Sequence, residues 1–189
     1  MKCLVTGGAG FIGSNLVDYL IEQGHQVTVL DNLSTGHMSN LQQVEKKVEF
    51  INIDISNSKN SIDKYFTDVS WVFHLAGLAD IVPSIKNPNA YFQTNVQGTL
   101  NILEASRKAK IEKLIYAASA SCYGVPDKYP TDEKSKIDPK YPYALTKFLG
   151  EQLTIHWAKI YKMPNISLRF FNVYGPRSRT TGAYGAVFG

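Results

Sequence analysis

Short runs of β-branched and aliphatic residues alternate along the chain with longer segments whose apolar residues recur at helical spacing. The short runs predict six strands, Cys3–Thr6, Val27–Leu30, Val48–Ile53, Trp71–Leu75, Lys113–Ala117 and Ile166–Phe171. The longer segments predict helices over residues 11–23, 59–68, 89–109 and 141–163. Alternating strands and helices form a parallel sheet covered on both faces, so the pattern predicts a doubly wound, Rossmann-like α/β fold.

The chain is long enough and apolar enough for one well-buried domain, with 189 residues of which 44% are hydrophobic. The net charge of +4 has its one basic cluster at residues 107–113, where a helix is predicted to end, and this placement argues against nucleic-acid binding. Two cysteines and four scattered histidines predict neither a disulfide framework nor a metal site, and no apolar run is long enough to cross a bilayer. We therefore expect a soluble protein of a reducing, cytoplasmic compartment.

A glycine-rich turn joins the first strand to the first helix, with Gly7, Gly10 and Gly13 at every third position. Glycines at such a junction let backbone N–H groups approach a pyrophosphate, and the helix N-terminus adds favourable partial positive charge. Asp31 ends the second strand, where a carboxylate accepts hydrogen bonds from an adenosine ribose and repels a 2′-phosphate. Because no arginine stands near Asp31 in the sequence, these residues predict NAD rather than NADP.

Two side chains with acid–base chemistry stand four residues apart in the last predicted helix, so Tyr143 and Lys147 share one helical face. A free tyrosine has a pKa of about 10, and a nearby ammonium group and an oxidised nicotinamide both favour its phenolate. Tyr143 is therefore a candidate general base. Ser119 and Ser121 follow the fifth strand, at the carboxyl edge where doubly wound sheets bind ligands. His74 also ends a strand, and we interpret it as a structural hydrogen-bonding residue.

Eight segments, taken in order, resemble the extended short-chain dehydrogenases/reductases, specifically the NAD-dependent nucleotide-sugar epimerase/dehydratase family. They are Leu4–Gly13, Asp31–Ser34, Asp54–Ile55, His74–Gly77, Asn95–Thr99, Ser119–Gly124, Tyr143–Lys147 and Leu168–Arg177. The resemblance covers the whole chain. It implies a doubly wound fold, NAD as the cofactor and a nucleotide sugar of the UDP-hexose class as the substrate.

The resemblance also implies roles for individual residues. Tyr143 would be the catalytic base, Ser119 would assist proton transfer, and Lys147 would bind the nicotinamide ribose. Asn172 would touch the diphosphate of the substrate, and the other expected substrate-binding residues are Ser119, Ser121 and Tyr143. The residues expected to bind the cofactor are Gly7, Gly10, Phe11, Ile12, Gly13, Asp31, Asn32, Leu33, Ser34, Thr35, Gly36, Asp54, Ile55, Leu75, Ala76, Gly77, Ala79, Asn95, Ser119, Tyr143, Lys147 and Phe171.

The reaction that the resemblance favours is epimerisation at C4 of the hexose. The 4,6-dehydratases of the family carry a Thr-Asp-Glu triplet after the fifth strand, whereas this chain has Ser119-Ala120-Ser121 there, without a carboxylate. Residues 131–133 spell that triplet, but they lie in a predicted surface loop over residues 124–140. Family decarboxylases and reductases share the cofactor site and the Tyr/Lys pair, so these reactions, dehydration and a catalytically silent NAD-binding fragment remain alternatives.

Members of the family extend well beyond the position that matches Gly189, and their C-terminal part supplies most of the substrate pocket. We therefore expect residues 1–189 to be a truncated NAD-binding domain whose substrate domain is largely absent and which has little or no activity by itself. The resemblance further implies a homodimer through the predicted helices at 89–109 and 141–163. These helices carry Tyr91, Phe92, Leu100, Leu103, Phe148 and Trp157.

Overall fold

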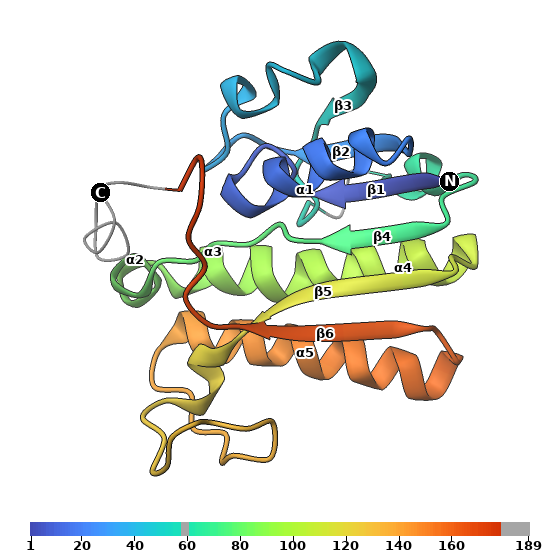
Figure 1. Ribbon diagram of the computed structural model, residues 1–189. Helices are drawn as coiled ribbons and strands as arrows, with labels where there is room; N and C mark the ends of the chain where they lie inside the picture. Colours follow the sequence, from blue (N-terminus) through green and yellow to red (C-terminus); the bar gives the residue numbers. More distant parts are fainter. Residues whose placement is uncertain (58–60, 179–189) are drawn as a thin grey trace.

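The sheet of this protein has six parallel strands in the order β3-β2-β1-β4-β5-β6, in a computed structural model that describes residues 1–57 and 61–178 (Figure 1). This arrangement confirms the predicted doubly wound sheet. All six predicted strands are present, with ends that differ by one or two residues from the prediction. They are β1 (Lys2–Thr6), β2 (Gln26–Asp31), β3 (Val48–Asn52), β4 (Trp71–His74), β5 (Lys113–Ser119) and β6 (Asn165–Phe170).

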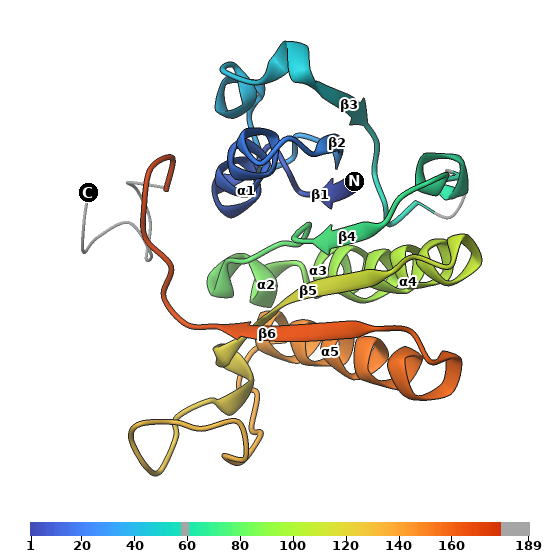
Figure 2. The ribbon, with the colours of Figure 1, turned by 45° about the vertical axis from the view of Figure 1, so that its right-hand side comes forward.

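Helices lie on both faces of the sheet (Figure 2). One face of β1 and β2 is covered by α1 (Phe11–Glu22), whereas α4 (Gly98–Ala109) and α5 (Pro142–Tyr161) lie side by side on the other face. The sheet therefore divides the buried apolar residues into two clusters. The smaller surrounds Val17 of α1, and the larger surrounds Ile102 of α4.

The helix predicted over residues 59–68 is wrong. Residues 58–60 lie outside the described part, and beyond them Asp63–Phe66 forms only a short 3₁₀ helix. Ile62, Phe66 and Val69 are buried, but the backbone is already extended at Thr67 (ψ 125°), directly after Phe66, so the helix does not continue to residue 68. The other 3₁₀ helices are Met38–Leu41, Glu45–Lys47 and Ala120–Tyr123.

The helix predicted over residues 89–109 is present but interrupted. It consists of α3 (Pro88–Phe92), a π-helical turn at Gln93–Gln97, and α4. A short helix that the sequence did not predict, α2 (Ile81–Lys86), precedes it. Pro83 occupies the first turn of α2, where its missing N–H would have no intrahelical partner.

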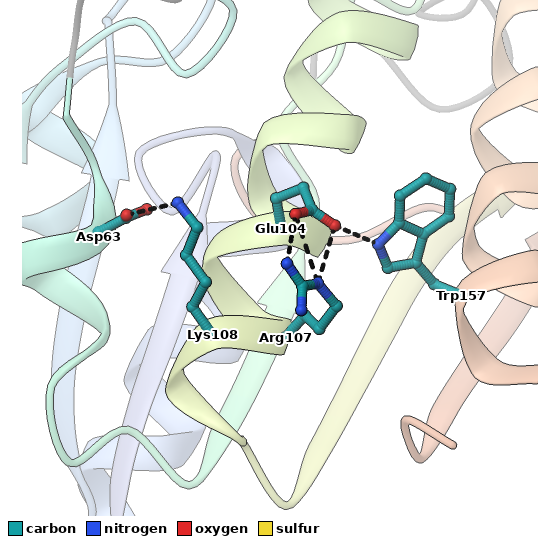
Figure 3. Close-up of polar contacts among 5 residues, drawn as sticks. All are labelled: Asp63, Glu104, Arg107, Lys108 and Trp157. Carbon is teal, nitrogen blue, oxygen red and sulfur yellow. Dashed lines mark hydrogen bonds and ion pairs between the residues drawn. The ribbon is translucent and has the colours of Figure 1, made fainter. Parts of the chain in front are cut away.

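Polar contacts join α4 to its neighbours (Figure 3). The carboxylate of Glu104 accepts hydrogen bonds from Arg107 and, at 2.8 Å, from the indole nitrogen of Trp157 in α5. Lys108 pairs with Asp63 of the 3₁₀ helix at 2.8 Å. The bond between Glu104 and Trp157 joins α4 to α5, the helix that carries the candidate base.

The carboxyl ends of all six strands meet at one edge of the sheet. In the parallel register, Thr6 of β1 pairs with His74 of β4, and Ser119 of β5 pairs with Phe170 of β6. The strand order reverses between β1 and β4, which is the position where doubly wound sheets bind ligands. The predicted surface loop at 124–140 contains neither helix nor strand and lies at the same edge. Within the described ranges, no helix is both long and apolar enough to span a membrane.

Candidate active site

The glycine-rich turn packs so closely against its surroundings that two of its glycines leave no room for a side chain. Gly7 has φ +70°, and a Cβ there would lie 2.7 Å from the backbone nitrogen of Ala76. A Cβ on Gly13 would lie only 2.1 Å from the carbonyl oxygen of Gly7. At Gly10 the nearest atom to an added Cβ is the same oxygen at 3.2 Å. Gly10 therefore faces more open space at the N-terminus of α1, where an anion can approach the first backbone N–H groups.

Asp31 shapes this turn as well as facing the cleft beside it. The side chain is 8% exposed, and its Oδ2 accepts a hydrogen bond from the Ala9 N–H at 2.9 Å. Its Oδ1 accepts another from the Leu33 N–H at 2.8 Å. A carboxylate has about four acceptor positions, so capacity remains for the hydroxyl groups of a ribose. The sequence predicted the ribose contact but not the bond to the glycine turn.

A cleft of about 330 Å³ runs along the carboxyl edge between the glycine turn, the end of β2 and the segment that follows β4. Its walls offer helix N-terminal N–H groups for a pyrophosphate, a carboxylate for a ribose and the apolar Ile53 and Ile55 for an aromatic base, so the cleft fits a dinucleotide. Of the residues predicted to bind the cofactor, those that line it are Gly7, Gly10, Phe11, Ile12, Gly13, Asp31, Asn32, Ser34, Thr35, Asp54, Ile55, Leu75, Ala76, Gly77 and Ala79.

Leu33 and Gly36, also predicted to bind the cofactor, do not line this cleft. Leu33 has a left-handed backbone (φ 57°), and its N–H donates a hydrogen bond to Asp31 Oδ1 at 2.8 Å. A Cβ on Gly36 would lie 2.8 Å from the carbonyl carbon of Ala9. Both residues thus hold the loop after β2 against the glycine turn.

Asn95 is likewise fully buried rather than part of the cleft wall. Its Oδ1 accepts a hydrogen bond from the Leu78 N–H at 2.9 Å, and its Nδ2 donates to the Leu78 carbonyl and to Thr146 Oγ1, both at 3.1 Å. The π-helical turn places Asn95 for these contacts. Asn95 therefore supports the segment after β4 from behind.

Residues distant in sequence complete the cleft, and sequence reasoning missed them. His37, Asn40 and Arg177 all line it. After β6 the chain crosses the carboxyl edge toward α1 (Figure 1), where Arg177 pairs with Asp18 and donates a hydrogen bond to the Asn40 carbonyl at 2.8 Å. The only sequence signal for Arg177 was its position at the end of the last segment of the family resemblance, Leu168–Arg177. The contact itself depends on tertiary packing.

The predicted catalytic hydroxyl groups come together beyond the cleft. Tyr143 begins the first turn of α5, and its hydroxyl donates a hydrogen bond to Ser119 Oγ at 3.3 Å. Ser119 ends β5, and its Oγ lies 2.8 Å from Ser121 Oγ. The ring of Tyr143 packs edge-on against buried Tyr91, with centroids 6.4 Å apart. This arrangement holds the phenol next to a second hydroxyl group that can relay or share a proton.

Lys147 lies one turn further along α5 and is 6% exposed. Burial lowers the pKa of its ammonium group to about 8. Its Nζ lies 4.5 Å from the centroid of the Tyr116 ring and 3.6 Å from the point where a Cβ on Gly77 would be. Gly77 lines the cleft, so the ammonium group of Lys147 lies directly behind the cofactor-side wall.

Phe171 and Asn172 lie just after β6 and are both exposed. The ring of Phe171 stacks on that of Tyr123, with centroids 6.3 Å apart. Neither lines the cleft, which reaches only the nearby Val173 and the residues 177–178. The structure thus places these two predicted residues at the same edge of the sheet, exposed and outside the cleft.

His74 is a buried structural residue, as its position at the end of a strand suggested. The Thr99 hydroxyl donates to the Asn95 carbonyl at 2.6 Å, so its oxygen accepts from His74 Nε2–H at 2.9 Å. Nδ1 then accepts from the Thr6 hydroxyl at 2.7 Å. Burial, followed by the charge of Lys147, lowers the pKa of His74 to about 3. The neutral ring therefore links β1, β4 and α4.

Comparison with known proteins agrees with this geometry. The family model described as "NAD dependent epimerase/dehydratase family" matches residues 3–188. A putative UDP-glucose 4-epimerase of Methanocaldococcus jannaschii is 42% identical over 97% of this chain and 60% of its own length. The crystal structure of the UDP-glucose 4-epimerase of Thermus thermophilus in complex with NAD is 39% identical, with a TM-score of 0.89 over 98% of this chain and 60% of that one.

Relatives with another reaction are also similar. The UDP-N-acetyl-alpha-D-glucosaminuronate decarboxylase of Bacillus cytotoxicus is 36% identical over 98% of this chain and 58% of its own length. The chain thus spans about 60% of the length of the curated relatives that it matches. Relatives named for different nucleotide-sugar reactions are thus similar to this chain to about the same extent.

Proposed function

This chain belongs to the NAD-dependent epimerase/dehydratase family, and we propose that it forms the cofactor-binding and catalytic part of a UDP-hexose 4-epimerase. The observation that carries the proposal is the hydrogen bond between Tyr143 and Ser119, at 3.3 Å, with buried Lys147 one turn away. A base, a second hydroxyl group and a buried cation thus meet beside a dinucleotide cleft.

The expectation of NAD as the cofactor is confirmed by the family match and by the NAD complex of the Thermus relative. We expect the glycine turn to hold its pyrophosphate, Asp31 its adenosine ribose and Lys147 its nicotinamide ribose. The negative charge of Asp31 would repel a 2′-phosphate. When bound, the cofactor supplies a reversible hydride acceptor for the sugar carbon.

The residues of this chain would move the proton. Tyr143 would accept the proton of the 4-hydroxyl as that carbon is oxidised, and would return it once the opposite face is reduced. Ser119, already bonded to the phenol, would orient the same hydroxyl. Lys147, positively charged below pH 8, would stabilise negative charge on Tyr143 through its position on the same helical face. Ser121 and Asn172 would contact the substrate.

Decarboxylation is the second candidate, because the Bacillus cytotoxicus decarboxylase is 36% identical to this chain. By the family resemblance, decarboxylases share the cofactor site and the Tyr/Lys pair with epimerases. Dehydration fits less well, because the Ser119-Ala120-Ser121 turn offers no carboxylate for water elimination.

We further propose that residues 1–189 are an NAD-binding domain whose substrate side is completed by polypeptide of the kind that the longer relatives carry. Ile166 and Leu168 of β6 are 43% and 39% exposed, on a face that no helix of residues 1–57 and 61–178 covers (Figures 1 and 2). Parallel sheets are normally covered on both faces. We then expect the chain alone to bind NAD but to turn over little substrate. For the complete protein we propose a cytoplasmic homodimer.

The test is conversion of UDP-glucose to UDP-galactose, and of the N-acetylated pair, by this chain and by a form extended with a relative's C-terminal segment. We expect turnover by the extended form, and loss of about 10²–10⁴-fold in Tyr143→Phe with NAD still bound. Release of CO₂ from a UDP-uronate without epimerisation would establish the decarboxylase instead. Full activity of Tyr143→Phe would exclude Tyr143 as the base.

A further inference from the structure

Arg169 of β6 forms a buried ion pair with Glu151 on the helix that carries the catalytic residues. Its Nε donates to Glu151 Oε2 at 2.9 Å, and its second terminal nitrogen donates to Oε1 at 2.7 Å. The carboxylate is 2% exposed and the Arg169 side chain 19%. A planar guanidinium held by two parallel hydrogen bonds has a fixed orientation, which a lysine could not reproduce.

The remaining terminal nitrogen of Arg169 points to two other segments. It donates to the Tyr123 hydroxyl at 2.7 Å and to the carbonyl oxygen of Glu133 at 3.1 Å. Tyr123 ends the 3₁₀ helix that follows β5, and Glu133 lies in the loop at 124–140. Glu151 and Tyr123 both raise the pKa of the guanidinium above its usual value, so the cation persists at any physiological pH. One side chain therefore joins α5, the turn that begins at Ser119 and the loop at 124–140.

These segments carry the two ends of the candidate proton-transfer bond. Ser119 begins the serine turn, which we define as residues 119–124, and Tyr143, Lys147 and Glu151 follow one another every four residues on α5. In the register of the sheet, Arg169 pairs with Ala118, next to Ser119. The position of Ser119 relative to Tyr143 thus depends on how the serine turn is held against α5.

We propose that Arg169 is a positioning residue that holds the serine turn and the loop at 124–140 against α5, and so sets the Ser119–Tyr143 geometry and the substrate-side wall of the site. The catalytic consequence rests on the proposed function. The structural consequence does not, because it concerns contacts within this chain.

Two substitutions separate this role from simple stability. Tyr123→Phe removes only the hydroxyl that accepts from Arg169 and keeps the buried ion pair and the stacking on Phe171. Arg169→Lys keeps a positive charge beside Glu151 but cannot reach all three segments. The control is Arg107→Lys, which alters an arginine–glutamate ion pair within α4 that is more exposed and does not involve the serine turn or the loop.

The first measurement is trypsin cleavage of the NAD-bound chain in the loop, which contains Lys128, Lys134, Lys136 and Lys140. We expect cleavage to be faster by about tenfold in Tyr123→Phe and Arg169→Lys, and unchanged in Arg107→Lys, with NAD affinity unchanged in all three. Unchanged loop cleavage would overturn the proposal. Loss of NAD binding in step with cleavage would also overturn it, because a general loosening would then explain both.

The second measurement is kcat in the extended, active form. We expect kcat to fall by about tenfold in Tyr123→Phe and Arg169→Lys with no change in NAD affinity, since only the proton-transfer geometry is altered. A loosened loop with unchanged kcat would overturn the positioning role. Failure of the unsubstituted form to epimerise would instead count against the proposed function and would leave the cleavage result to decide the role of Arg169 in holding the loop.

Discussion

Gly10 and Gly13 belong to the same turn but differ in what a side chain would meet. A Cβ on Gly13 would overlap the Gly7 carbonyl at 2.1 Å, whereas one on Gly10 would lie 3.2 Å from it. Gly13→Ala should therefore destabilise the fold by about 1–3 kcal/mol, because α1 must move away from the turn. Gly10→Val should cost less stability than Gly13→Ala, because the Gly7 carbonyl needs to move by only a few tenths of an ångström, and should weaken NAD binding at least about tenfold by blocking the pyrophosphate.

Thermal unfolding and calorimetric titration of NAD distinguish the two variants. A loss of 1 kcal/mol lowers Tm by about 2–4 °C in a domain of this size. The interpretation fails if Gly10→Val binds NAD with the affinity of the parent, or if Gly13→Ala has the same Tm as the parent.

His74 makes the stability of the fold depend on pH. Its pKa is about 3 in the folded state and 6.5 as a free side chain, so below pH 6.5 the unfolded chain binds a proton that the folded chain does not. The contribution of the neutral ring is complete above pH 6.5 and is lost as the pH falls toward 3, at about 1.4 kcal/mol per pH unit. Urea unfolding should show the stability of the parent falling relative to His74→Asn by about 2 kcal/mol between pH 6.5 and 5. A constant difference between the two proteins would contradict this.

The positions of side chains were predictable where local spacing or a family motif carried them. The glycines, Asp31, Ser119, Tyr143 and Lys147 lie at one edge because the carboxyl ends of parallel strands and the helix that follows them meet there. The second role of Asp31, as acceptor for the Ala9 N–H, was not predictable, since it depends on how the loop after β2 folds back.

At the scale of elements, the strands were predicted well because each is a short, buried apolar run between turn residues. The helix at 59–68 failed although Ile62, Phe66 and Val69 do face the core. Periodicity reports which residues are buried, but the chain becomes extended at Thr67 and the segment is limited to a short 3₁₀ helix, which depends on the surrounding fold. The spacing of apolar residues likewise gives no sign of the π-helical turn in the helix at 89–109, because that turn also depends on the surrounding fold.

That π-helical turn positions Asn95 toward the segment after β4, and such turns often occur at functional sites. Asn95→Ala would leave the N–H and carbonyl of Leu78 without these partners, at a cost of about 1–3 kcal/mol. We expect NAD affinity to fall by about tenfold, because Gly77 and Leu78 form part of the cleft wall. Asn165→Ala is the control, since Asn165 bonds to the Thr154 carbonyl far from the cleft. Equal effects of the two substitutions on NAD binding would refute a specific role.

At the scale of the whole molecule, most residues of the predicted dimer surface on α3, α4 and α5 differ from the outward face of α5 in what they expose. Tyr91 and Leu103, included in the predicted dimer surface, are buried in the core of the chain itself, and Trp157 bonds to Glu104. The side chains of these residues already make contacts within the chain. The outward face of α5 is different, because Leu145 and Ile160 are 46% and 59% exposed.

If the proposed homodimer forms through α4 and α5, covering this outward face supplies part of its free energy. Leu145→Glu combined with Ile160→Glu would place two carboxylates in the interface and should shift the protein toward monomer, because a buried charge without a partner is strongly unfavourable. Tyr19→Glu is the control, since Tyr19 is 58% exposed on α1, which covers the other face of the sheet. Light scattering over a range of concentrations measures the mass of each variant. A dimer that survives the double substitution must use another surface, and a parent that is monomeric at high concentration would remove the dimer proposal.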